Sequence, residues 1–304
     1  MPRADPRGLI FKIMMESLSK CRLKRFRDIV IDSKLFITLL TKTILDFLLS
    51  KYRGLPPGRL YLLGGDPGTG KTTILLDILA NIQLTNPGSR VLFISFEMNE
   101  NDLADYMVRF PKFQDIDILF LDSNSVEEDE DVLETMESVL SDGYHVVGLD
   151  SFVVAQGLIS ENLGITMKRS ENHLLKMMKN QMLGQNGRKL MTTFIDIQQM
   201  VKSGDFAGTM ALKHAVDATM ELRLEKRHNI YSDRYIVFSK LRAGTPFQKL
   251  YFSLSGEGGN VVFDEERFKR DMMAQKIQED NKRNLRDAAD AFDNMFNQND
   301  VDEQ

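Results

Sequence analysis

The sequence is poor in the residues that build disulfides and structural metal sites. It contains one cysteine, Cys21, four histidines and no tryptophan among 304 residues. A single cysteine excludes an intrachain disulfide and any cysteine-rich zinc site. The histidines do not pair at the spacing of metal ligands. This composition suits a reducing compartment, and we expect a cytoplasmic protein.

Long apolar runs and a strong charge imbalance are also missing. No run approaches the roughly 20 apolar residues of a membrane-spanning helix, and residues 1–5 lack the layout of a signal peptide. We therefore expect no membrane partner. The net charge of -5 disfavours a protein that coats nucleic acid with its whole surface, but it allows a local basic channel. The densest basic stretch, residues 20–27, is either a nucleic-acid contact or a solvated helix face.

What the chain does contain is a complete G-x-x-x-x-G-K-T motif between the apolar run 60–63 and the helix-like run 73–80. A strand, a glycine-rich turn and a helix in this order predict a phosphate-binding loop, although a glycine-rich turn can match by chance. The glycines let backbone N–H groups converge on phosphate oxygens, and the helix start adds partial positive charge. The predicted nucleotide-binding residues are Gly65, Asp66, Pro67, Gly68, Thr69, Gly70, Lys71, Thr72 and Thr73.

Three side chains are predicted to hold ATP and Mg²⁺, the cofactors that we expect. Lys71 can reach the β- and γ-phosphates, and the Thr72 hydroxyl can ligate Mg²⁺. Downstream, the apolar run 144–149 ends on Asp150. An aspartate at the end of a strand after a phosphate loop predicts the second group of the Mg²⁺ shell, acting through water.

Strand-like and helix-like segments alternate along the middle of the chain. This order predicts an α/β fold with a mainly parallel central sheet covered by helices, and a ligand at the carboxyl ends of the strands. The predicted strands are 60–63, 90–96, 116–121, 144–151, 188–197, 219–224, 235–239 and 249–254, of which 219–224 and 235–239 look paired. The predicted helices include 73–80, 126–140, 169–183, 211–216 and one capped by residues 99–102.

The two ends of the chain are predicted to differ from this middle. Residues 1–50 form an N-terminal helical and basic arm, in which 35–49 reads as a helix, and 51–263 form the core. Within the core, residues 154–167 show no clear period. Residues 264–304 form a tail whose apolar positions recur at helical spacing, so we expect a helix that docks on the core or on a partner, with disorder from Asn297 onward.

Five segments in order resemble the RecA-like ATPases, specifically the branch of RadA (Sms) and the DnaB-type ring helicases. They are L-P-P-G-R-L-Y-L-L-G-G-D-P-G at 55–68, S-F-E-M at 95–98, L-D-S at 149–151, K-S-G-D-F-A-G with L-K-H-A-V-D within 202–217, and K-L-R-A-G at 240–244. The resemblance covers residues 45–263 and implies a RecA-like P-loop NTPase core. The zinc motif and Lon-like domain of RadA and the N-terminal domain of DnaB-type helicases are expected to be absent.

The resemblance implies roles for residues outside the phosphate loop. Glu97 would activate water, unless it is a strand-end carboxylate in a salt bridge. Gln198 or Gln199 would sense the γ-phosphate, and the doubled glutamine leaves the register open. Lys240 and Arg242 would stabilise charge on the nucleotide of a neighbouring subunit, unless they form an exposed basic hairpin.

The resemblance also implies two loops, about 154–169 and 200–208, that face the axis of a ring and meet single-stranded DNA. Lys168, Arg169 and Lys202 are candidates for phosphate contacts. Phe206 would stack on a base, unless it belongs to the core.

The sequence therefore predicts an ATP- and Mg²⁺-dependent motor, stimulated by single-stranded DNA, that forms a homo-oligomer, a hexameric ring. It would act as a DNA helicase or branch-migration ATPase in DNA replication, repair or recombination. Two alternatives stay open: a filament-forming recombinase, and a slow KaiC-like nucleotide switch or loader. A replication or recombination protein is the partner expected at the C-terminal tail.

Overall fold

The computed structural model describes residues 37–121, 131–184, 190–199, 210–226, 229, 231–242, 248–254 and 259–299. The chain divides into two compact units, Met1–Phe36 and Ile37–Gln304. The first unit lies outside the described residues, so the fold reported below is that of the second.

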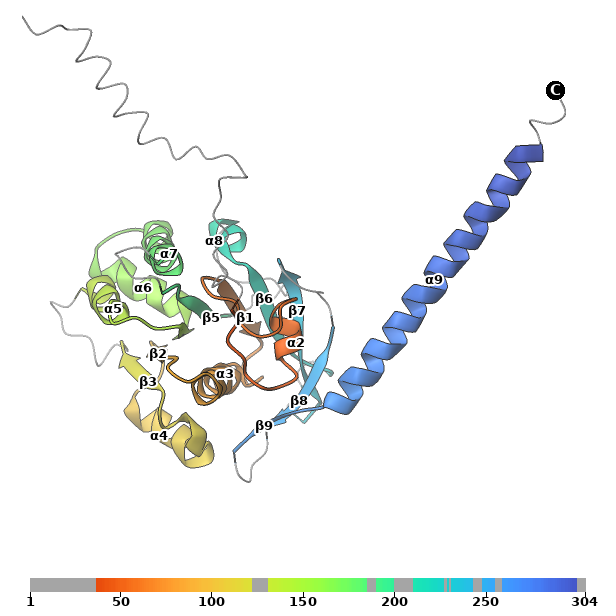
Figure 1. Ribbon diagram of the computed structural model, residues 1–304. Coiled ribbons are helices and arrows are strands. Elements are labelled where there is room, and N and C mark those ends of the chain that lie inside the picture. The colour runs from red at the N-terminus through yellow and green to blue at the C-terminus, as the bar shows by residue number, and fades with distance from the viewer. Residues whose placement is uncertain are drawn as a thin grey trace, which may run out of the picture. The chain divides into compact units, whose positions relative to one another are not determined.

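A mainly parallel sheet runs through the described unit (Figure 1). Its strand order is β3-β2-β4-β5-β1-β6-β7-β8-β9; neighbours from β3 to β6 are parallel, and those from β6 to β9 are antiparallel. The strands are β1 (Leu60–Gly65), β2 (Val91–Ser95), β3 (Asp117–Phe120), β4 (Val146–Asp150), β5 (Thr193–Gln199), β6 (Ala218–Leu224), β7 (Arg234–Leu241), β8 (Leu250–Leu254) and β9 (Val261–Phe263). This architecture confirms the predicted α/β fold and the pairing of β6 with β7.

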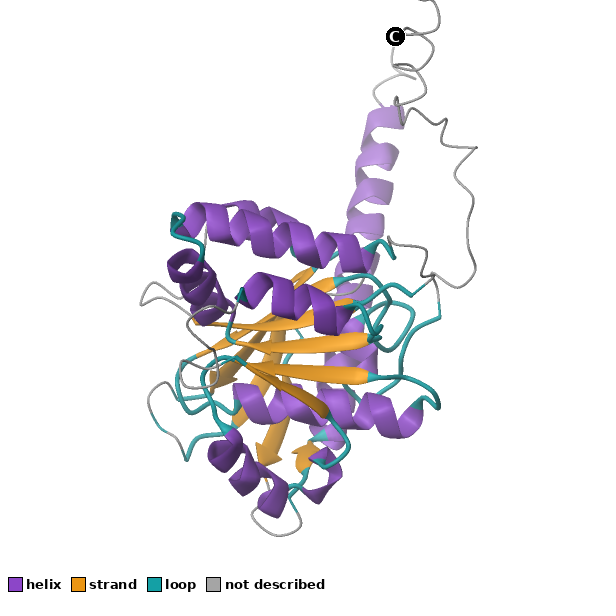
Figure 2. Ribbon diagram, turned by 90° about the vertical axis from the view of Figure 1, so that its left-hand side faces the viewer, coloured by secondary structure: helices purple, strands orange, loops and turns teal. Residues whose placement is uncertain are grey.

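Helices cover both faces of the sheet, as the edge-on view in Figure 2 shows. One face carries α3 (Lys71–Thr85), α4 (Glu100–Arg109) and the 3₁₀ turn η3 (Pro111–Phe113), and the other carries α5 (Val132–Leu140), α6 (Phe152–Asn162), α7 (Met167–Met182) and α8 (Met210–Ala215). Two further helices are α2 (Asp46–Leu49) and α9 (Glu265–Asn299). None of the helices in the described ranges is both long and apolar enough to cross a membrane.

The central strands are buried on both faces because each side receives a helix layer. In β1, Leu60 and Leu62 pack toward α6 and α7, whereas Tyr61 and Leu63 pack toward α3. Such strands read as continuous apolar runs rather than alternating ones. The packing of α3 is close: a Cβ on Gly148 of β4 would lie 2.9 Å from Leu75 Cδ1.

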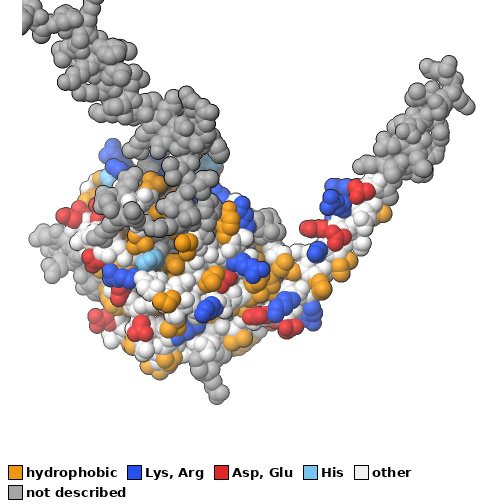
Figure 3. All heavy atoms as spheres, in the orientation of Figure 1, with side chains coloured by type: hydrophobic (Ala, Val, Ile, Leu, Met, Phe, Trp, Pro, Cys, Tyr) orange, Lys and Arg blue, Asp and Glu red, His pale blue; other side chains and the backbone are white. Residues whose placement is uncertain are grey.

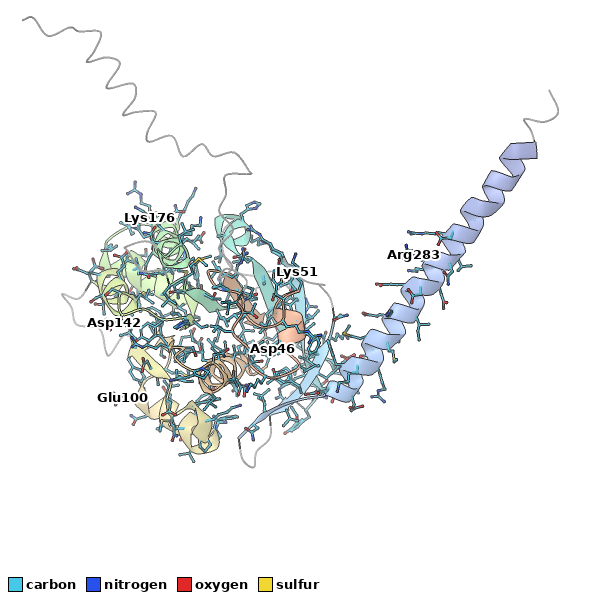
Figure 4. The ribbon with its side chains drawn as sticks, in the orientation of Figure 1. Asp46, Lys51, Glu100, Asp142, Lys176 and Arg283 are labelled. Atoms are coloured by element: carbon cyan, nitrogen blue, oxygen red, sulfur yellow. The ribbon has the colours of Figure 1, made fainter. Side chains whose placement is uncertain are left out.

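The helix predicted over 35–49 is wrong for most of the length that the structure describes. Residues 46–49 form α2, where Figure 4 labels Asp46. The Asp46 carboxylate accepts hydrogen bonds from Thr41 N–H (2.9 Å), from the Thr41 hydroxyl (2.8 Å) and from Lys42 N–H (3.0 Å). Aspartate and threonine side chains that bind nearby backbone in this way compete with a helix.

The loop expected over 154–169 is also wrong for most of its length, because α6 runs to Asn162 and α7 begins at Met167. The run has no helical period since Ala155 and Ile159 are buried against the sheet while Val154 and Leu158 also pack into the same core. A helix that is apolar on several sides lacks the stripe by which helices are predicted.

Several boundaries also differ from the predicted ones. Helix α5 begins at Val132, capped by the Asp131 side chain, and residues 122–130 lie outside the described ranges. Strand β5 starts at Thr193 and continues through both glutamines, and β9 was not predicted. Disorder was expected from Asn297, but α9 runs to Asn299.

The predicted C-terminal helix docks on the core through its first turns. Phe268 of α9 is 3% exposed, and the Arg267 guanidinium lies 3.3 Å from the ring centroid of Tyr251 on β8. From Asp271 to Asp287 the side chains are exposed; one of them is Arg283, which Figure 4 labels.

Candidate nucleotide-binding site

The carboxyl end of β1 and the start of α3 form the glycine-rich loop. Gly68 and Gly70 adopt φ angles of 76° and 95°, in the left-handed region that glycine tolerates. A Cβ on Gly65 would lie 2.6 Å from the Leu222 carbonyl oxygen of β6. The first N–H groups of α3, which begins at Lys71, have no intrahelical partners and are free for an anion.

The Lys71 side chain folds back over this loop. Its Nζ donates to the carbonyl oxygens of Gly65 (3.0 Å) and Asp66 (3.2 Å). Burial lowers the pKa of Lys71, and the nearby Asp150 and Glu97 carboxylates oppose that shift. The ammonium group therefore sits at the hollow, where phosphate oxygens can replace the two carbonyl partners.

Thr72 and Asp150 meet directly at the junction of α3 and β4. Thr72 Oγ1 donates to Asp150 Oδ2 at 2.6 Å, and Asp150 is 5% exposed. Burial raises the pKa of Asp150 to about 6, while the hydrogen bond from Thr72 acts in the opposite direction. A hydroxyl and a carboxylate are the hard oxygen donors that Mg²⁺ takes, so these residues fit the ion. No cluster of three or more His, Cys, Asp or Glu suited to another metal occurs in the described ranges.

Glu97 lies two residues after the end of β2 and lines the same pocket. The turn around it is fixed by Ser95, whose hydroxyl donates to the Met98 carbonyl (2.7 Å) and accepts from Met98 N–H (3.1 Å). The Glu97 carboxylate accepts a hydrogen bond from the Ser151 hydroxyl. No described lysine or arginine forms an ion pair with Glu97, so the salt-bridge alternative gains no support from the structure.

These groups share a pocket of about 510 Å³, a size in the range of small-molecule sites. The loop, Lys71 and the carboxylates supply polar lining, and the lining also includes Tyr106 of α4 and Leu254 of β8. Sequence reasoning missed these two because no motif marks them. The described lining is Gly65, Pro67, Gly68, Gly70, Lys71, Thr72, Thr73, Glu97, Tyr106, Asp150, Ile197 and Leu254.

The strand register fixes the face of the sheet on which Gln198 lies. Gln198 pairs across the sheet with Gly64 and is 1% exposed. Ile197 lines the nucleotide pocket, so strand alternation places Gln198 on the opposite face of the sheet. The Gln199 side chain lies outside the described residues.

Lys240 and Arg242 lie near the amino ends of β1 and β6, whereas the phosphate loop follows the carboxyl end of β1. Lys240 Nζ donates to the Lys213 carbonyl (2.7 Å), and Arg242 donates to the His214 carbonyl (3.1 Å) and to Asp217 Oδ1 (3.3 Å). Asp217 Oδ2 also accepts the N–H of Leu60, the first residue of β1. Leu60 and Gly65, the two ends of β1, are five residue steps apart at about 3.3 Å each, so Asp217 and its partners lie about 17 Å from the loop.

The predicted DNA contacts divide into described and undescribed residues. Lys168 and Arg169 are exposed in the first turn of α7, the helix on which Figure 4 labels Lys176. Lys202 and Phe206 lie outside the described ranges. On the face drawn in Figure 3, acidic and basic side chains are interspersed rather than gathered by sign.

Comparisons with known proteins agree with this geometry. A family model described as "ATPase: KaiC" matches residues 41–266. The chain is 27% identical over 187 residues to the DNA repair protein RadA of Streptococcus pyogenes serotype M6, which is 58% of this chain and 35% of that protein. RadA of Chlamydia muridarum is 27% identical over 206 residues, 67% of this chain and 41% of that protein. The chain thus spans less than half the length of these curated relatives.

A solved structure shares the fold. It is that of a KaiC-like protein from the hyperthermophilic archaeon Pyrococcus horikoshii OT3, which superimposes with a TM-score of 0.57 at 18% sequence identity. The match covers 75% of this chain and 98% of that one.

Proposed function

The chain belongs to the KaiC family of ATPases, with distant RadA relatives, and from this membership we propose that it hydrolyses ATP as an oligomeric motor stimulated by single-stranded DNA. The motor would be a helicase or a branch-migration ATPase that acts in DNA replication, repair or recombination. One observation supports the oligomeric part of the proposal: Lys71 lies at the carboxyl ends of the parallel strands, whereas Lys240 and Arg242 lie near their amino ends.

The pocket holds nearly all that hydrolysis needs from one chain. Lys71 would bind the β- and γ-phosphates, and Thr72 and Asp150 would hold Mg²⁺, which neutralises charge on the phosphates when bound. Glu97 would orient the attacking water and take its proton. Gln198 or Gln199 would sense whether the γ-phosphate is present.

The missing contribution is a second cation for the charge that develops on the transferred phosphoryl group. Among the described residues that line the pocket, only Lys71 is positively charged. Lys240 and Arg242 are held about 17 Å from the loop, near the amino ends of the parallel strands β1 and β6. Their place supports a role on the nucleotide of a neighbouring copy, as in rings where an arginine acts in trans. A hexameric ring is the assembly that we propose.

Single-stranded DNA is the proposed stimulus because the named relatives are DNA repair proteins. Lys168 and Arg169, exposed at the start of α7, would contact DNA phosphates. Lys202 would do the same and Phe206 would stack on a base. The C-terminal tail would bind a replication or recombination protein.

The test is a steady-state ATPase assay of the full chain with and without single-stranded DNA, at several salt concentrations. We expect turnover that rises with DNA and is abolished in Lys71→Ala. Absence of DNA stimulation at every salt concentration contradicts the motor. Strand exchange with a homologous duplex would instead identify a recombinase.

A slow nucleotide switch is the second candidate, and the KaiC family match is the observation that favours it. A switch would bind ATP tightly, turn over very slowly with or without DNA, and bind a protein partner in the ATP state alone. Lys71→Ala would then abolish partner binding while wild-type turnover stayed near background.

A further inference from the structure

Ser151 occupies a position where a serine ordinarily has a structural task. It directly follows Asp150, is 1% exposed, and is the residue that precedes the first turn of α6. Serine is among the preferred residues at such an N-cap because its hydroxyl accepts a hydrogen bond from the helix N–H groups. Here the Ser151 side chain makes no capping hydrogen bond.

The Ser151 hydroxyl instead forms a hydrogen bond with the Glu97 carboxylate. Ser151 Oγ donates to Glu97 Oε1, across the gap between the ends of β4 and β2. The two strand ends are held together by the backbone, since Ser95 pairs with Asp150 and Phe96 N–H donates to the Asp150 carbonyl at 2.8 Å. The side-chain bond therefore joins two elements that the sheet already fixes.

We propose that Ser151 is a positioning residue for Glu97, a proposal that rests on the hydrolytic function proposed above. Ser95 fixes the backbone turn that carries Glu97, and Ser151 fixes its carboxylate. With Oε1 bound, Oε2 is the oxygen left to accept a proton from water. Two consecutive residues at the end of β4 would thus have different tasks. Asp150, bonded to Thr72, would hold Mg²⁺, and Ser151, bonded to Glu97, would orient the carboxylate that activates water.

The variants Ser151→Ala and Ser151→Thr separate this role from a structural one. Loss of the hydroxyl is expected to lower kcat by about tenfold, part of the 10² to 10⁴ that general-base catalysis contributes, with the KM for ATP and the affinity for ADP unchanged. Threonine keeps a hydroxyl and is expected to restore most of kcat. Ser170→Ala is the control: Ser170 is fully buried, but its hydroxyl binds the Gln156 carbonyl in the α6–α7 packing, so its loss should lower the melting temperature and leave kcat unchanged.

A second readout does not depend on turnover. The affinity for ADP with aluminium fluoride, a mimic of the transition state, should fall in Ser151→Ala by about the same factor as kcat, while ADP affinity does not change. If Ser151→Ala keeps the kcat and the mimic affinity of the wild type, the inference is overturned. A kcat higher than that of the wild type overturns it as well, because it would mean that the hydrogen bond restrains Glu97. If wild-type protein itself shows no turnover, the proposed function fails, and mimic affinity alone decides the role of Ser151.

Discussion

Asp196 should make the stability of this protein fall as pH rises. It lies on β5 between Leu62 of β1 and Leu149 of β4, is 0% exposed, and neither carboxylate oxygen has a hydrogen-bond partner in the described part of the chain. Burial raises the pKa of Asp196 well above its ordinary value, with no charged neighbour contributing to the shift. The folded protein therefore holds a proton that the unfolded chain releases.

Proton linkage gives the direction and the size of the change in the free energy of unfolding with pH. Below about pH 3.9, the ordinary pKa of aspartate, both states are protonated and Asp196 has no effect. Above that pH the folded state binds one more proton, so the free energy of unfolding falls by about 1.4 kcal/mol per pH unit until the raised folded pKa is passed. At roughly 2–4 °C per kcal/mol for a domain of 150–250 residues, this is about 3–6 °C in Tm per pH unit.

Asp196→Asn removes the titrating group with little change in shape, so the assay is thermal unfolding of both proteins from pH 5 to pH 8. The Tm of Asp196→Asn minus the Tm of the wild type should increase as pH rises, so it should be lowest at pH 5. Asp115→Asn is the control, because Asp115 is exposed. Parallel Tm curves for wild type and Asp196→Asn would refute the burial argument.

We expect three further outcomes, two from variants in the nucleotide pocket and one from a variant in the packing of α3 against the sheet. Lys71→Ala should abolish binding of a fluorescent ATP analogue, because it removes the cation of the pocket; retained affinity would contradict this. Glu97→Gln should bind ATP like wild type but stop turnover, measured as phosphate release; normal release would show that another group activates water. Gly148→Ala should destabilise the fold by about 1–3 kcal/mol in urea unfolding, because its Cβ would lie 2.9 Å from Leu75 Cδ1; an unchanged midpoint would mean that α3 adjusts freely.

Local order in the sequence is sufficient to predict the phosphate loop and its aspartate. Gly65 to Thr72 are contiguous, and Asp150 ends an apolar run, so neither requires knowledge of tertiary contacts. Glu97 also follows a predicted strand, but its role is predicted from the resemblance of S-F-E-M at 95–98 to the DnaB-type helicases. The parallel sheet is predictable because strands buried on both faces leave continuous apolar runs.

The features that sequence reasoning missed depend on contacts between distant segments. Tyr106 and Leu254 reach the pocket from α4 and β8, far apart in the chain. Ser151 looks like an ordinary helix cap, and its bond to Glu97 appears only when β2 and β4 are paired. Helix α6 escaped detection because burial on several sides removes its period.

Arg242 provides the most direct test of a site completed by a second copy. Its matched control is Arg59, which binds the same Asp217 oxygen at the same 3.3 Å distance and is similarly exposed. Arg242→Ala should retain ATP binding and lose turnover by a factor on the order of 10³, whereas Arg59→Ala should hydrolyse like wild type. Equal losses would indicate that Asp217 is disturbed.

The decisive measurement mixes Arg242→Ala with Lys71→Ala in the presence of single-stranded DNA. The first variant has an intact pocket, and the second has an intact Arg242. Mixed oligomers should recover ATPase activity well above the sum of the two separate proteins, because some pockets then face a functional neighbour. Activity no greater than that sum, or wild-type turnover of Arg242→Ala alone, would contradict a site shared between copies.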